Sequence, residues 1–143
     1  MTSVGTGLPA WELPVTPTLV VSTAIATRDY QDVHHDRDLA QSHGSKDIFV
    51  NILSTTGLVQ KYVGDWARSA IGPDFVIRSC ALRLGAPAHP YDTLSFSGEV
   101  TEQADGVLTI DVVGKVPLGD HVTAKLVVST GSTDVSDMSG VSA

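Results

Sequence analysis

The spacing of hydrophobic positions changes about halfway along the chain. From Ile48 to Trp66, apolar residues recur near helical spacing, and Gly72-Pro73 should end a helix. From Phe75 onward, apolar and polar residues alternate with the period of two that is typical of strands. The pattern therefore predicts one long helix over about 48–70, followed by consecutive strands.

The early part of the predicted helix is apolar nearly all round, because Phe49 and Val50 add to the regularly spaced positions. Such a helix is expected to be buried on more than one side. Asp47 stands at the expected N-cap, where its carboxylate would accept hydrogen bonds from exposed backbone N–H groups. Gly57 lowers helix stability by about 0.8–1.0 kcal/mol relative to alanine. We interpret it as a position that permits close approach of a backbone or a ligand.

Four strands are predicted after the helix. They cover about residues 75–84, 94–100, 107–113 and 122–128. Asp105-Gly106 and Leu118-Gly119-Asp120 are strong hairpin signals. Gly85–Pro90 contains two prolines, which prevent ladder pairing, so this segment is expected to be a loop.

The first part of the chain predicts mostly extended structure. A β-branched run indicates a strand over about 19–27. Residues 1–18 contain three prolines and read as an extended lead-in, which Trp11 and Leu13 should anchor to the core. Asp38–Ser42 fits one short helical turn.

This order of elements predicts an α+β fold. A helix that is apolar nearly all round must be covered on several sides, and an antiparallel sheet of about five strands wrapped around it does this, which is the hot-dog architecture. A dimer that continues the sheet would protect one of its edges. We expect a single domain over residues 1–130 and a disordered tail over residues 131–143.

Composition limits the possible partners. The chain has 143 residues, 42% of them hydrophobic, and a net charge of −7, which argues against nucleic acid and anionic membranes as partners. No apolar run approaches the roughly 18 residues that span a bilayer, and no signal peptide is expected. The lone Cys80 fits a reducing cytoplasm and reads as a small core residue.

The candidate chemistry lies in the polar stretch Asp29–Asp36, directly after the predicted first strand. A solvated loop is the simplest interpretation of such a stretch. However, Asp29 and His34 lie five residues apart, and a carboxylate paired with an imidazole can hold a water molecule and move its protons.

Arg28–Asp36 resembles the G-D-x-N-P-x-H motif of MaoC-like, R-specific enoyl-CoA hydratases, with Asp29 and His34 on the motif's aspartate and histidine. Arg83–Leu94 is similar to the family's P-V-x-P-G-D-T-L strand, and the resemblance covers about residues 15–130. Residues 44–53 and 118–124 look more specifically like the small subunit of actinobacterial steroid side-chain hydratases. Those subunits pair with a larger MaoC-like subunit.

The resemblance implies hydration of an enoyl-CoA, with a larger MaoC-like subunit as partner and CoA as part of the substrate rather than a separate cofactor. Asp29 and His34 would be the catalytic pair. Asn51, Val50 and Gly57 would bind substrate, with the Asn51 N–H and the helix dipole stabilising charge on the thioester oxygen. No metal is expected, because the adjacent His34 and His35 lack a suitably spaced third ligand.

The chain departs from the motif at three places. Arg28 replaces a glycine, Gln31-Asp32 replaces Asn-Pro, and Asn51 replaces a glycine near the start of the long helix. Loss of the proline frees the loop backbone, which suggests that a partner subunit holds the catalytic pair.

Two alternative functions remain open from the sequence: a hot-dog acyl-CoA thioesterase and a non-catalytic stabilising subunit of a hydratase. Among the other polar residues, His35 and Asp36 are expected to stabilise the loop. His43, His89 and His121 are expected to be loop or surface residues.

Overall fold

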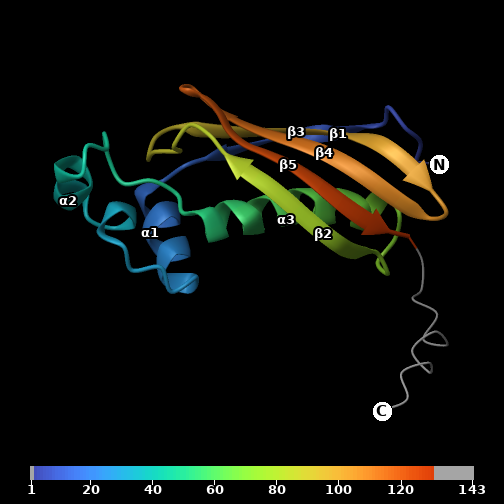
Figure 1. The fold of residues 1–143 in the computed structure, drawn as a ribbon, viewed down its shortest axis with the longest axis horizontal. Helices are drawn as coiled ribbons and strands as arrows, with labels where there is room; N and C mark the ends of the chain where they lie inside the picture. The colour runs from blue at the N-terminus through green and yellow to red at the C-terminus, as the bar shows by residue number, and fades with distance from the viewer. Residues whose placement is uncertain (1, 131–143) are drawn as a thin grey trace, which may run out of the picture.

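The computed structural model describes residues 2–130, in which five strands form one antiparallel sheet of order β1-β3-β4-β5-β2. The strands are β1 Gly7–Pro14, β2 Val76–Leu84, β3 Thr93–Ala104, β4 Val107–Val116 and β5 Gly119–Ser129. The long helix α3, Ile52–Ala70, lies along one face of this sheet (Figure 1). The predicted hot-dog architecture is therefore confirmed.

Three shorter helical elements precede α3. They are α1 Pro17–Ala26, the 3-10 turn η1 Asp32–His34 and α2 Arg37–Ser42. Figure 1 shows α1 and α2 at one end of the molecule, beside the N-terminal end of α3. These elements place the polar stretch near the first turn of the long helix.

The strand predicted over residues 19–27 is wrong, because this region forms helix α1. The Thr16 side chain caps the helix by accepting a hydrogen bond from the Leu19 amide over 3.0 Å, and a proline occupies the first turn. Val20 and Ala24, one turn apart, are buried. Capping and packing thus outweigh the strand preference of the β-branched residues.

The fifth strand comes instead from the N-terminal lead-in. β1 pairs with β3, and the pairing shifts register between Leu8 and Trp11. The Trp11 ring stacks on Phe96 at 5.3 Å and on Tyr62 at 6.3 Å between centroids, which confirms Trp11 as an anchor. The tail predicted to be disordered, residues 131–143, lies outside the described residues.

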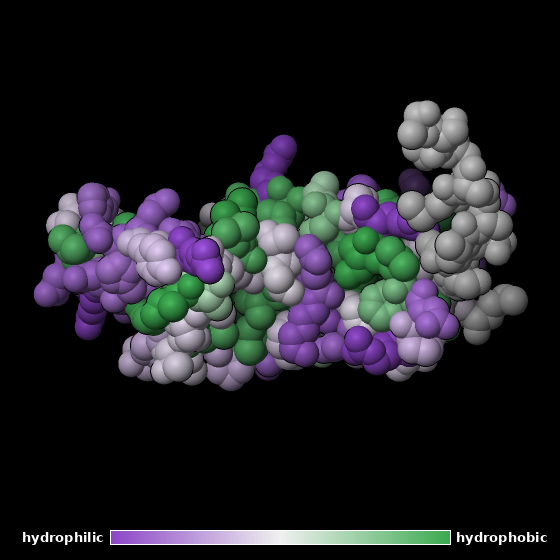
Figure 2. Space-filling model, turned by 90° about the horizontal axis from the view of Figure 1, so that it is seen from below, coloured by the Kyte–Doolittle hydropathy of each residue, from purple (hydrophilic) through white to green (hydrophobic). Residues whose placement is uncertain are grey.

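The long helix begins later than its hydrophobic pattern predicts. It starts at Ile52 with Asn51 as N-cap, whereas the Asp47 carboxylate accepts from the adjacent Ile48 amide over 2.8 Å and caps no helix. Ile52 and Leu53 are 51% and 54% exposed, so this chain alone does not cover the helix on all sides. Figure 2 shows the molecule from the side on which α3 lies, where apolar and polar areas lie side by side.

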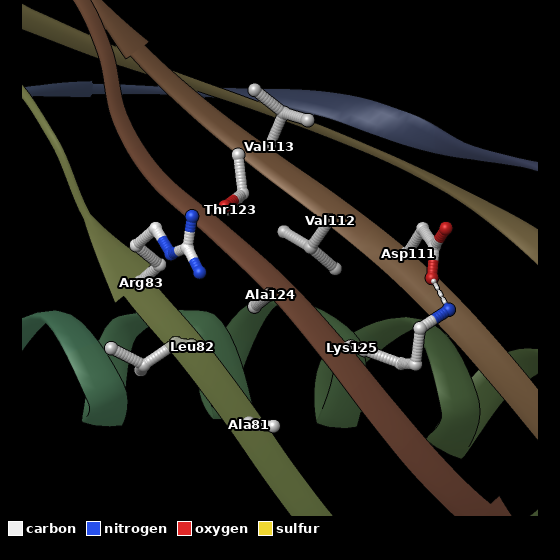
Figure 3. Close-up of a pocket in the computed structure, with 9 residues that line it drawn as sticks. All are labelled: Ala81, Leu82, Arg83, Asp111, Val112, Val113, Thr123, Ala124 and Lys125. Atoms are coloured by element: carbon white, nitrogen blue, oxygen red, sulfur yellow. Dashed lines mark hydrogen bonds and ion pairs between the residues drawn. The ribbon is translucent and has the colours of Figure 1, made fainter.

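The core lies between the sheet and α3. Alternate residues of the strands are buried there, among them Leu94, Phe96, Ile110 and Leu126. The other face of the sheet carries a shallow groove of about 540 Å³ across β2, β4 and β5, with α3 passing behind these strands (Figure 3). An exposed Lys125–Asp111 ion pair of 2.7 Å spans part of this groove, which contains none of the predicted site residues. Within residues 2–130, no helix is long and apolar enough to cross a membrane.

Candidate active site

A cleft of about 320 Å³ brings together residues from four parts of the chain: the loop after α1, the N-terminal end of α3, the connection between β2 and β3, and the start of β5. Its lining residues are Asp29, Gln31, His34, Phe49, Val50, Asn51, Ile52, Leu84, Gly85, Ala86, Pro87 and His121. Four of the five predicted site residues therefore share one cleft.

The backbone of Asp29 is fixed by the C-terminal end of α1. The Arg28 amide donates to the Ile25 carbonyl over 3.0 Å, and the Asp29 amide donates to the Ala24 carbonyl over 2.9 Å. Together with the positive φ of 55° at Arg28, these bonds form a Schellman motif. This Schellman motif requires the left-handed conformation at Arg28, the conformation that glycine, present at this place in the G-D-x-N-P-x-H motif, adopts without strain.

The carboxylate of Asp29 accepts hydrogen bonds through both oxygens. Oδ2 accepts from Asn51 Nδ2 over 3.0 Å, and Oδ1 accepts from the Gln31 amide over 3.3 Å. The Asn51 bond is the main cause of a lowered pKa at Asp29; partial burial opposes it, while the Gln31 bond and the nearby His34 add to the lowering. Asp29 is therefore a carboxylate near neutral pH.

His34 is buried, with 5% of its surface exposed, and its Nδ1 lies 2.7 Å from the Phe49 carbonyl oxygen. Because a carbonyl oxygen only accepts, Nδ1 must carry the proton. In the neutral ring, Nε2 then presents a lone pair, and it lies 3.3 Å from Asp29 Oδ2. A water molecule in the cleft can donate a hydrogen to either atom, and the 3.3 Å between them suits a direct hydrogen bond when Nε2 also carries a proton.

The loop between Asp29 and His34 is held by the chain's own hydrogen bonds despite the missing proline. The His34 amide donates to the Gln31 carbonyl over 3.0 Å, and the Asp36 amide donates to the Asp32 carbonyl over 2.9 Å. From outside the loop, the Phe49 amide donates to the Val33 carbonyl oxygen over 3.1 Å. The loop geometry therefore does not depend on a partner subunit alone.

His35 and Asp36 stabilise this region, as predicted. His35 Nε2 lies 3.2 Å from the Tyr30 carbonyl oxygen. Asp36 caps α2 by accepting from the Leu39 amide over 3.0 Å.

The side chain of Asn51 joins the acid to the long helix. Its Nδ2 donates to Asp29 and, over 2.9 Å, to Thr27 Oγ1, while its Oδ1 accepts from the Ser54 amide and hydroxyl. The sequence assigned a role only to the Asn51 backbone N–H, so this side-chain function was missed. The signal that could have found it is the strong N-cap preference of asparagine directly before the helix.

Comparisons with known proteins identify a close sequence relative of this chain. No protein-family model matches the chain. The chain is 60% identical over 129 residues to the 3-oxo-4,17-pregnadiene-20-carboxyl-CoA hydratase beta subunit of Mycobacterium tuberculosis, covering 90% of this chain and 97% of that protein. The chain belongs to this hydratase beta-subunit family.

Solved structures agree with the hydratase beta-subunit family and with the hot-dog fold. A chain in the crystal structure of the ChsH1-ChsH2 complex from Mycobacterium tuberculosis is 60% identical, with a TM-score of 0.87 over 92% of this chain and 100% of that chain. The (R)-hydratase from A. caviae involved in PHA biosynthesis is 18% identical, with a TM-score of 0.80 over 90% of this chain and 97% of that chain. The second likeness supports the fold alone.

Gly57, the remaining predicted substrate contact, does not line the cleft of this chain. The glycine is exposed, and a Cβ built on it would meet no atom within 4 Å. No part of the described chain therefore approaches it closely, and contact between Gly57 and substrate stays a prediction.

Of the histidines expected on loops or the surface, His89 lies in the loop between β2 and β3 but is buried, whereas His121 is buried on β5, so the prediction was wrong for His121. Only 3% and 2% of their surfaces are exposed, whereas His43 is exposed as predicted. The Nδ1 atom of His89 lies 3.0 Å from the Ile48 carbonyl oxygen, and that of His121 lies 2.7 Å from the Ala86 carbonyl oxygen. Both rings thus fasten backbone segments, a role that depends on contacts distant in sequence.

Proposed function

We propose that this chain is a subunit of a heteromeric enoyl-CoA hydratase that adds water across the α,β double bond of a steroid side-chain CoA thioester. The single observation that carries the proposal is the Asp29–His34 pair, whose Oδ2 and Nε2 atoms lie 3.3 Å apart in a cleft. The family membership supports both the reaction and 3-oxo-4,17-pregnadiene-20-carboxyl-CoA as substrate.

In the proposed reaction, a water molecule in the cleft donates a hydrogen to one member of the Asp29–His34 pair and turns its lone pairs toward the substrate. The water oxygen attacks the β-carbon, and the Asp29–His34 pair takes up one proton from the water. The pair then delivers one proton to the α-carbon and ends the reaction in its starting state. The acid and base geometry is set by Asn51 and by the Phe49 carbonyl. A positioned acid–base group contributes roughly 10²–10⁴ in rate.

Charge on the thioester oxygen needs a hydrogen-bond donor, and we assign this role to the Asn51 backbone N–H. Asn51 lines the cleft at the N-terminus of α3, where the helix dipole favours negative charge. Within residues 2–130, its amide has no hydrogen-bond acceptor of its own. Val50, which also lines the cleft, would contact the acyl-CoA.

We further propose a larger MaoC-like subunit as partner and the cytoplasm as the location. β2 is an edge strand of the sheet, and Ile52 and Leu53 next to the cleft are half exposed. Exposed apolar side chains beside an open strand edge favour association with another chain. The structure of the ChsH1-ChsH2 complex, which contains a close relative, supports a heteromeric assembly.

The proposal is tested by purifying the chain together with its co-expressed partner and supplying 3-oxo-4,17-pregnadiene-20-carboxyl-CoA. Loss of the enoyl absorbance without release of free CoA supports hydration, whereas stoichiometric CoA release would identify a thioesterase. The chain purified alone should hydrate this substrate only weakly. Full activity of the chain alone would contradict the heteromeric proposal.

A further inference from the structure

His121 occupies a position in the cleft that the acid–base pair does not explain. It lies at the start of β5, is 2% exposed and contributes to the lining. Its two ring nitrogens bond different elements: Nδ1 lies 2.7 Å from the Ala86 carbonyl oxygen, and Nε2 lies 2.8 Å from Thr55 Oγ1 on α3.

The hydrogen bonds of His121 fix its tautomer. The Ala86 carbonyl can only accept, so Nδ1 carries the proton, and Nε2 accepts from the Thr55 hydroxyl. Burial lowers the pKa of His121 although the bond to Ala86 opposes this, which favours the neutral ring. The ring is therefore satisfied at both nitrogens and has no free group to offer a substrate.

Ala86 belongs to the wall of the cleft formed by residues 85–87, which is fastened to the start of β5. The Gly85 and Ala86 amides donate to the His121 and Asp120 carbonyls, each over 2.8 Å. A Cβ at Gly85 would collide with the Asp120 carbonyl oxygen, so only glycine permits this approach. Residues 85–87 and the start of β5 thus form one close-packed unit.

Thr55 lies on the other side of His121, in the first turn of α3. The same turn carries Asn51, which holds Asp29 and borders the cleft. His121 therefore links the wall at residues 85–87 to the helix end that positions the acid.

We propose that His121 is a positioning residue that sets the width of the cleft, by holding the wall at residues 85–87 at a fixed distance from the first turn of α3. This inference rests on the proposed hydratase function for its kinetic consequence. Its structural content is independent of that function. A widened cleft would bind the acyl-CoA less tightly while leaving the Asp29–His34 pair in place.

Two substitutions separate the bonds of His121. In His121→Asn the side-chain amide replaces Nδ1 and keeps the bond to Ala86, whereas His121→Gln places an acceptor near Thr55 and loses the bond to Ala86. We expect His121→Gln to raise KM by about fivefold, the effect of one lost neutral hydrogen bond, with kcat changed much less. His121→Asn, which loses the bond to Thr55 instead, should raise KM by a similar factor, because loss of either bond breaks the link between the wall and α3.

Thr109→Val serves as the stability control, because it removes a buried hydroxyl on β4 that bonds Glu102 and lines no part of the cleft. All variants are compared as complexes with the co-expressed partner, and amide hydrogen exchange of Gly85 and Ala86 is measured in parallel. Exchange should quicken in His121→Gln and not in Thr109→Val.

The outcomes separate the two proposals. Faster exchange at Gly85 and Ala86 in a complex that hydrates no enoyl-CoA would contradict the function and leave the role of His121 standing. An active complex in which His121→Gln alters neither KM nor this exchange would overturn the role of His121. A wild-type KM in either the Asn or the Gln variant would overturn it as well, since the link between the wall and α3 requires both bonds.

Discussion

The side-chain amide of Asn51 donates a 3.0 Å hydrogen bond to Asp29 Oδ2, the same oxygen that faces His34. One residue thereby caps α3 and holds the carboxylate of the proposed catalytic pair. The two functions belong to different atoms, because Oδ1 caps the helix and Nδ2 binds the carboxylate. They can therefore be separated by substitution.

Asn51→Ser should keep the helix cap and lose the donor to Asp29. Serine and asparagine cap helices about equally well, so the helix cap should persist, whereas loss of the bonds to Asp29 and Thr27 should lower the free energy of unfolding by about 1–3 kcal/mol. Hydration should fall by roughly tenfold, since a hydrogen bond to a charged group is lost. The acidic limb of the pH–rate profile should move to higher pH, because the main cause of the lowered pKa of Asp29 is removed. An unmoved acidic limb would contradict this role of Asn51.

Asp29→Asn and His34→Asn test the catalytic pair directly. Both substitutions retain local hydrogen bonds: the first can still accept from Asn51, and the second can still donate to the Phe49 carbonyl. We expect folded complexes in which hydration falls by roughly 10²–10⁴. Thermal unfolding of each complex provides the control, and near-normal turnover in both variants would refute the assignment.

The lowered pKa of Asp29 also makes stability depend on pH. A carboxyl group whose pKa is depressed below its ordinary value of 3.8 stabilises the folded chain above that value, and the contribution is lost as pH falls through the depressed folded-state pKa. Asp29→Asn should therefore flatten the acidic decline in the free energy of unfolding. Urea unfolding over a series of acidic pH values measures this decline, and parallel curves for the two proteins would be the contrary result.

Arg28→Gly should stabilise the chain by up to about 1 kcal/mol. Arginine at φ 55° carries the cost of the left-handed conformation, which glycine avoids at the expense of greater freedom in the unfolded chain. Arg28→Ala is the matched control, because it removes the exposed side chain and retains the strained conformation. Denaturant unfolding of both variants would show whether glycine alone gives the gain; equal stability of the two would argue against strain at this position.

The sheet could be predicted from the sequence because alternation with a period of two and glycine turns are local signals. Helix α1 could not, since its β-branched residues favour a strand and only the cap at Thr16 and the burial of Val20 and Ala24 decide for a helix. The onset of α3 was placed too early for a related reason. Ile48 and Val50 are apolar because they pack in the core, yet residues 48–50 form a non-helical segment before the helix.

For the candidate site, the motif spacing located Asp29 and His34, and both line the cleft. The sequence did not predict the hydrogen bonds that fix side chains of the cleft where the two bonded residues are distant along the chain. His121 bonds a carbonyl 35 positions earlier in the chain, and His34 bonds one 15 positions later. Spacing along the sequence does not show such contacts.

The short segment of residues 48–50 has a consequence for how this enzyme family can change. The Ile48 carbonyl bonds His89 Nδ1, and the Phe49 backbone bonds both Val33 and His34. The Val50 amide donates to the Ala88 carbonyl. A substitution at His89 or Ala88 would shift the carbonyl that orients the proposed catalytic histidine, although neither residue lines the cleft. Turnover can thus evolve through positions that no substrate touches, while the surface that recognises the substrate stays the same.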